Sequence, residues 1–236
     1  VLDKAGKPVK GASVHIQQRR HAFLFGCNIF PLFDYKDDKQ ITYAKEFSAL
    51  FNYATIAFYW GAYEPAKNAY GLAEANDKRI ARWCKDHGIE TKGHPLVWHE
   101  VFPNWAPNDP DELKPLLQKR VTEIIPDFKE LISRWDVVNE ATVSAGIDNG
   151  VGHLIKRDGA AKVVGEALDW AHSANPNALL IYNDFNIGPD MDKLVSDLIT
   201  ADKPLGAIGL QSHMHQGEWT LEHTWEICEE FGRFGK

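Results

Sequence analysis

The sequence lacks the charge pattern of a nucleic-acid-binding protein and the long apolar segment of a membrane protein. Its 236 residues carry a net charge of −7, with no long run of Lys and Arg. Clustered basic residues supply most of the affinity for nucleic acid, so no nucleic-acid partner is expected. No apolar run approaches the roughly 20 residues that span a bilayer, so no membrane-embedded segment is expected either.

Cysteine is also scarce, and two glycine-rich signatures are missing. The only cysteines are Cys27, Cys84 and Cys228, an odd number without a C-x-x-C pair. At least one must be free, and we expect all three to be buried as small apolar side chains. No G-x-G-x-x-G motif follows the first expected strand, and no P-loop occurs in the chain. The common dinucleotide and nucleoside triphosphate sites are therefore not expected.

The chain does contain a repeated pattern, in which a short apolar segment ends in polar residues and is followed by a helical pattern. With 44% hydrophobic and 25% charged residues, it is long enough for one large α/β domain. We expect a short β-rich segment over residues 1–20, with a turn near 4–8 and a strand near 14–16, and a barrel domain over 21–236. The expected strands cover residues 23–30, 53–60, 89–98, 133–141, 178–186 and 206–215. The expected helices cover residues 41–51, 72–87, 111–129, 159–174, 191–201 and 220–231.

Alternation of strands and helices predicts a parallel sheet, either doubly wound or closed as a (β/α)8 TIM barrel. Polar residues follow nearly all the expected strands, and in a barrel these strand ends share the face where chemistry occurs. This favours the TIM barrel, with only about six βα units present in this chain. Two units short of closure, the sheet would expose two edges, and we expect the isolated chain to be unstable unless another segment covers them. The polar residues are Asn28, His94, His99, Asn139, Glu140, Asn183, Asp184, Gln211 and His213.

Residues 134–141, with the sequence RWDVVNEA, are the clearest candidate for a catalytic strand. An apolar strand here delivers Asn139 and Glu140 to its end. A carboxyl in apolar surroundings has its ionised form disfavoured, which suits a general acid near neutral pH. Taken alone, the stretch is explained equally well by a strand end that meets water.

Four motifs, spaced about one βα unit apart, resemble glycoside hydrolase family 10, the endo-β-1,4-xylanase family. They are KGHPLVWH at 92–99, WDVVNEA at 135–141, YNDFN at 182–186 and GLQSH at 209–213. The pairs Phe51-Asn52 and Glu64-Pro65 match as well. The resemblance covers residues from about 21 to the end, and it implies a retaining hydrolase acting on xylan or a related plant or algal polysaccharide.

The resemblance also implies roles for individual residues. Glu140 would be the general acid/base, and His213 would support the nucleophile through a charge-assisted hydrogen bond. Asn139 would hydrogen-bond the sugar 2-hydroxyl in the −1 subsite. No cofactor and no metal are needed, since two carboxyls about 5 Å apart suffice for retaining hydrolysis. The further substrate-binding residues would be His94, Trp98, Gln211, Asn183 and Trp60.

The chain departs from the family pattern at two places. The nucleophile is expected on a strand after the sixth helix, and no Glu of this chain matches it; Glu218 lies in the preceding loop. Without that strand we expect no retaining hydrolysis. The second departure is residues 55–60, which keep Trp60 but lack the Glu, Asn and Lys that grip the −2 sugar. Phe58 and Tyr59 offer a stacking face there instead, which leaves the −2 sugar open.

Two alternatives remain open at this stage. The absent nucleophile fits a catalytically silent carbohydrate-binding relative. The spacing of His213 and His215 fits a barrel metallohydrolase, although no further ligands of obvious spacing accompany the pair. For the hydrolase, the expected partner is a polysaccharide, xylan or xylo-oligosaccharides. The expected location is extracellular or periplasmic, with the export signal not present in this chain.

Overall fold

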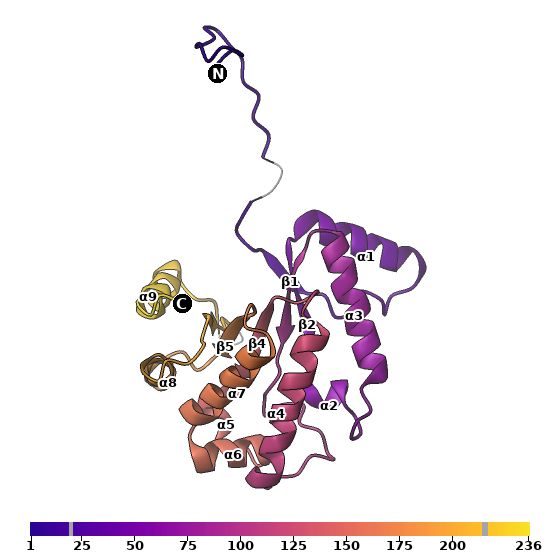
Figure 1. Ribbon diagram of the computed structural model, residues 1–236, viewed down its shortest axis with the longest axis vertical. Helices are drawn as coiled ribbons and strands as arrows, with labels where there is room; N and C mark the ends of the chain where they lie inside the picture. Colours follow the sequence, from indigo (N-terminus) through magenta and orange to yellow (C-terminus); the bar gives the residue numbers. More distant parts are fainter. Residues whose placement is uncertain (19–20, 214–216) are drawn as a thin grey trace.

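A computed structural model describes residues 1–18, 21–213 and 217–236. Within this part of the chain, six parallel strands form one sheet in sequence order, β1-β2-β3-β4-β5-β6, and each consecutive pair is hydrogen-bonded (Figure 1). This order confirms the predicted incomplete TIM barrel, since consecutive strands are neighbours and the helices between them return the chain. The strands are β1 (Gly26–Asn28), β2 (Tyr53–Ala57), β3 (Glu90–His94), β4 (Arg134–Asn139), β5 (Leu179–Asp184) and β6 (Ala207–Leu210).

The helices cover the outer face of this curved sheet. The longest, α4, begins at Pro110 after Asp109, whose side chain accepts hydrogen bonds from the backbone N–H groups of Asp111 and Glu112. Proline at the first helical position and an Asp cap together favour a helix start here. The helices are α1 (Asp37–Leu50), α2 (Trp60–Tyr63), α3 (Gly71–Asp86), α4 (Pro110–Asp127), α5 (Ala141–Ser144), α6 (Gly150–Asp158), α7 (Ala160–Ala174), α8 (Pro189–Thr200) and α9 (Leu221–Gly232).

The middle of the sheet is buried on both faces. Trp135 is fully buried and packs against Phe58, with ring centroids 4.9 Å apart. Gly93 on the neighbouring strand leaves room for the Trp135 indole, because a Cβ at Gly93 would overlap that ring. Strands with apolar residues on both faces are typical of parallel sheets covered by helices. This arrangement places Asn139, at the end of β4, on a rigid element.

The two edges of the sheet differ from its middle. β1 and β6 each pair with a single neighbour, and β6 has no fully buried residue. Cys27 on β1 and Cys228 on α9 are exposed, and only Cys84 is buried. The prediction that all three cysteines are buried was therefore wrong for two of them, since the burial of Cys27 and Cys228 depends on packing against other elements, which the local sequence does not reveal.

The expected elements were correct in order but not in length. The strand predicted at 23–30 contains only three strand residues, and the strand predicted at 89–98 ends at His94, with Val97 making an isolated bridge to Val138. Three short helices, α2, α5 and α6, lie in stretches that were not predicted to be helical. At the N-terminus, Leu2 and Pro8 form an antiparallel bridge, but the strand expected near 14–16 is absent.

Candidate functional site

Glu140 directly follows β4, and its backbone is in the left-handed region, with φ 57° and ψ 42°. For a residue with a Cβ this conformation costs about 1–2 kcal/mol, so neighbouring contacts must maintain it. The Glu140 N–H donates to the Asn183 carbonyl at 2.8 Å, and the Ser144 hydroxyl donates to the Glu140 carbonyl at 2.7 Å. These two hydrogen bonds fix the turn that directs the carboxylate away from the strand.

Two side chains from other strand ends bind the Glu140 carboxylate. The Trp98 indole N–H donates to Oε2 at 2.9 Å, and the Gln211 amide donates to Oε1 at 3.1 Å. Glu140 is only 8% exposed. A nearly buried carboxyl that receives one donor on each oxygen has a fixed orientation, as a general acid or base requires.

Three amide side chains continue this network. The Asn139 Oδ1 atom accepts from the Asn183 amide at 2.7 Å and from the Gln211 amide at 2.9 Å. The Gln211 Oε1 atom lies 2.7 Å from His213 Nε2, and an amide oxygen only accepts, so this nitrogen carries a hydrogen. The Asn139 side-chain oxygen thus accepts hydrogen bonds from two protein donors. Its amide nitrogen is the group that could donate a hydrogen bond to a ligand.

Next to these amides, His94 lies in a polar group centred on Asp136. Asp136 is fully buried, and its Oδ2 atom lies 2.6 Å from His94 Nδ1 and 2.7 Å from Lys92 Nζ. The Tyr59 ring packs against both His94 and Trp98, with centroid distances of 5.8 and 5.6 Å. Burial raises the pKa of the Tyr59 hydroxyl, and the charges of Glu140 and Asp136 add to this shift. Tyr59 therefore stays a neutral donor beside the candidate acid.

His99 packs behind Glu140. Its Nδ1 atom lies 2.7 Å from the Ser144 hydroxyl, and that hydroxyl already donates to the Glu140 carbonyl. Nδ1 must then carry the hydrogen, which leaves Nε2 unprotonated in the neutral ring. Burial lowers the pKa of His99, against an opposite effect of Glu140. Nε2 lies 4.0 Å from Glu140 Oε2.

The structure brings together seven of the eight predicted site residues. Six of them are joined by hydrogen bonds into one set: Glu140, Asn139, Trp98, Gln211, Asn183 and His213. His94 contacts this set through the rings of Tyr59 and Trp98.

Trp60 lies elsewhere, because α2 begins at this residue and turns its side chain to the outer side of the sheet. Its indole donates to Glu64 at 2.9 Å and packs against Phe102 and Trp105. The expectation for Phe58 was wrong: its ring is fully buried against Trp135 and Phe128, so only Tyr59 offers a face near Glu140. Asp136, Lys92 and Ser144 were missed, although Asp136 and Lys92 stand inside the matching motifs.

The described residues contain no group of three or more His, Cys, Asp or Glu side chains that could bind a metal ion. His215, which the metallohydrolase alternative requires, lies outside the described residues. Among the described helices, none is both long and apolar enough to span a bilayer.

Comparison with known proteins gives a consistent result. The family model described as "Glycosyl hydrolase family 10" matches residues 20–236. A β-1,4-xylanase of Dictyoglomus thermophilum is 30% identical over 173 residues, which cover 69% of this chain and 46% of the relative. Endo-1,4-β-xylanase B of Thermotoga neapolitana is 30% identical over 185 residues, 75% of this chain and 52% of the relative. The chain thus spans about half the length of these curated relatives.

Solved structures show the same fold. A psychrophilic family 10 endo-β-1,4-xylanase superposes with a TM-score of 0.74 at 24% identity, covering 90% of this chain and 70% of that one. Xylanase 10B of Thermotoga petrophila RKU-1, solved in complex with xylobiose, superposes with a TM-score of 0.73 at 24% identity, covering 89% of this chain and 66% of that one.

Proposed function

This chain belongs to glycosyl hydrolase family 10, and on that basis we propose that it is the acid/base half of a retaining endo-β-1,4-xylanase that acts on xylan or a related plant or algal polysaccharide. The observation that carries the proposal is the Glu140 carboxyl, nearly buried at the end of β4 and oriented by Trp98 and Gln211. A polysaccharide of this kind is found outside cells, so we place the protein in an extracellular or periplasmic location.

In this proposal, Glu140 protonates the glycosidic oxygen as the bond to the leaving sugar breaks. In the second step it removes a proton from the incoming water. Trp98 and Gln211 each donate to one carboxylate oxygen and so hold the carboxyl group in place, and each oxygen keeps a second lone pair for the proton that is transferred. The Asn139 amide nitrogen donates to the 2-hydroxyl of the −1 sugar, and the rings of Tyr59 and Trp98 provide apolar faces for the sugar.

Retaining hydrolysis also needs a nucleophilic carboxylate about 5 Å from the acid. Among the described residues, the Glu140 carboxylate accepts hydrogen bonds from Trp98 and Gln211 and lies 4.0 Å from His99, and none of these three is a carboxylate. We propose that the nucleophile comes from a strand placed beside β6, where His213 would donate a hydrogen bond to it.

The test uses a protein in which this chain is continued to a closed barrel. The Glu140→Gln variant is compared with the parent on phenyl and 2,4-dinitrophenyl β-xylobiosides. Loss of the general acid should lower the rate for the phenyl substrate by about 10²–10⁴-fold and far less for the dinitrophenyl substrate, whose leaving group needs no proton.

Equal rates for parent and variant on both substrates would rule out Glu140 as the acid. If the parent binds xylo-oligosaccharides but hydrolyses neither substrate, the sugar-binding alternative is supported. Release of the α-anomer as the first product would contradict the retaining mechanism.

A further inference from the structure

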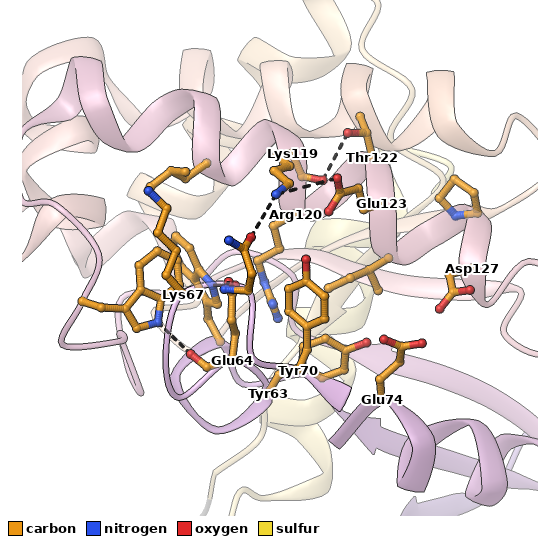
Figure 2. Close-up of a pocket in the computed structure, with 16 residues that line it drawn as sticks. Tyr63, Glu64, Lys67, Tyr70, Glu74, Lys119, Arg120, Thr122, Glu123 and Asp127 are labelled. Carbon is orange, nitrogen blue, oxygen red and sulfur yellow. Dashed lines mark hydrogen bonds and ion pairs between the residues drawn. The ribbon is translucent and has the colours of Figure 1, made fainter. Parts of the chain in front are cut away.

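A cavity of about 590 Å³, lined by described residues, lies away from Glu140 on the outer side of the sheet (Figure 2). It lies between α4 and the segment that contains α2 and the start of α3. Its volume is within the range of about 300–1,000 Å³ for small-molecule sites. Tyr59 and Trp60 are adjacent in sequence, yet Tyr59 contacts Trp98 in the candidate catalytic site and Trp60 lines this outer cavity.

The floor of the outer cavity is rigid. Arg120 on α4 is buried, and its guanidinium donates to the Leu96 carbonyl at 2.9 Å and to the Phe58 carbonyl. The same guanidinium lies over the rings of Trp60 and Tyr63, at 5.7 and 5.3 Å from the ring centres. These contacts join α4 to the ends of β2 and β3, so the floor is formed before any ligand arrives.

Two partly exposed aromatic residues form the walls. The Tyr70 ring lies 6.2 Å from Tyr63, with 32° between the ring planes, and Trp105 packs edge-on against Trp60 at 5.6 Å. The Trp105 indole donates to the Glu64 carbonyl at 2.8 Å, which fixes the orientation of its ring. Both rings therefore present fixed apolar faces to the cavity.

Positively and negatively charged side chains lie close to one another around the cavity. Lys78 pairs with Glu74 and Asp127, each at 2.6 Å. Lys119 lies 3.9 Å from Glu123 and donates to the side chain of Asn68 at 3.2 Å. Burial lowers the pKa of the Arg120 guanidinium to about 10, and the negative charge of Glu64 acts in the opposite direction. Lys67 also lines the cavity, so four cations and four carboxylates surround it in total. With these charges balanced, the cavity favours a neutral ligand rich in hydroxyl groups over a phosphate or another anion.

We propose that this outer cavity is a second saccharide site, which binds a short segment of a β-linked pyranose chain. A pyranose has an apolar C–H face that stacks on aromatic rings and a rim of hydroxyls that exchange hydrogen bonds with carboxylate, amide and ammonium groups. Tyr70 and Trp105 supply the rings, and Asn68, Lys119 and Glu123 supply the polar groups. The identification of the ligand as a xylo-oligosaccharide rests on the proposed function. The description of the cavity does not depend on that function.

The test follows the indole N–H resonances of Trp98 and Trp105 as xylotetraose is added to the Glu140→Gln form of the protein in which this chain is continued to a closed barrel. Trp98 reports on the candidate catalytic site and Trp105 on the outer cavity, and each resonance is assigned from its Trp→Phe variant. Both should shift saturably. In Tyr70→Leu, the affinity measured at Trp105 should fall about tenfold, because an aromatic stacking face is lost, while the Trp98 response remains unchanged. Tyr35→Leu, at an exposed tyrosine outside both sites, is the control.

A Trp105 resonance that does not respond to xylotetraose, or one that responds equally in the parent and in Tyr70→Leu, would overturn the second site. Loss of the Trp105 response in Tyr35→Leu would also overturn the second site, because Tyr35 lies outside the outer cavity. Failure of the proposed function looks different, since Trp98 would then not respond while Trp105 still does.

Discussion

β4 and β6 end on the same side of the sheet but in different surroundings. Five of the six residues of β4 are buried, whereas all four residues of β6 are only partly buried. β4 ends at Asn139 and leads directly to Glu140, and β6 leads to Gln211, whose amide contacts both of them. The comparison shows that the interior strand positions Glu140, while the edge strand leads to a side chain that contacts its carboxylate.

The first prediction measures how differently the interior and the edge contribute to stability. Phe58→Ala removes a fully buried ring that packs against Tyr63, Phe128 and Trp135, and should lower the free energy of unfolding by about 3–5 kcal/mol. Phe25→Ala, beside the edge strand β1 and 54% exposed, should cost about 1 kcal/mol or less. Urea denaturation of both variants checks this. Similar losses would mean that the edge is as well packed as the interior.

The motif spacing was enough to predict the strand order and the convergence of Glu140, Trp98 and Gln211. Each motif contains both the apolar residues that place a strand in the sheet and the polar residues at its end, so register and site are encoded together. The direction of Trp60 could not be predicted in this way. It depends on α2 beginning one residue after Tyr59, a four-residue helix too short to show a periodic pattern.

Features that depend on contacts between distant parts of the chain could not be predicted from the sequence either. Cys27 is exposed because β1 has β2 on one side and no described strand on the other. The outer cavity is formed by residues from α2, α3 and α4 that have no common spacing along the chain. Local patterns encode the burial of a residue within its own element, whereas these features arise from packing between elements.

A second prediction concerns a buried ionisable group, which lies in the interior of the molecule. Asp77 on α3 is 8% exposed, and burial raises its pKa from 3.8 to about 7. The folded state therefore retains a proton that the unfolded state releases above about pH 4, and stability is lost as the pH rises through 7. Asp77→Asn removes this effect, so the variant should gain about 2–4 kcal/mol on the parent between pH 4 and pH 8.

Urea denaturation at the two pH values measures this gain. Asp86→Asn, on an exposed position of the same helix, is the matched control and should show no such dependence on pH. A constant difference between Asp77→Asn and the parent at both pH values would contradict the assignment of a protonated buried Asp77.

The smallest effect is expected where interior and edge meet. Gln211→Ala removes the donor shared by Asn139 and Glu140, but Asn139 keeps its hydrogen bond from Asn183, and Glu140 keeps that from Trp98. Because Gln211 is partly exposed, the free energy of unfolding should fall by only about 1 kcal/mol. The matched interior change, Asn183→Ala, removes a buried amide and should cost more, about 1–3 kcal/mol. If Gln211→Ala proved the more destabilising of the two, the edge strand would be the main support of Glu140, and the division of roles between β4 and β6 would have to be reversed.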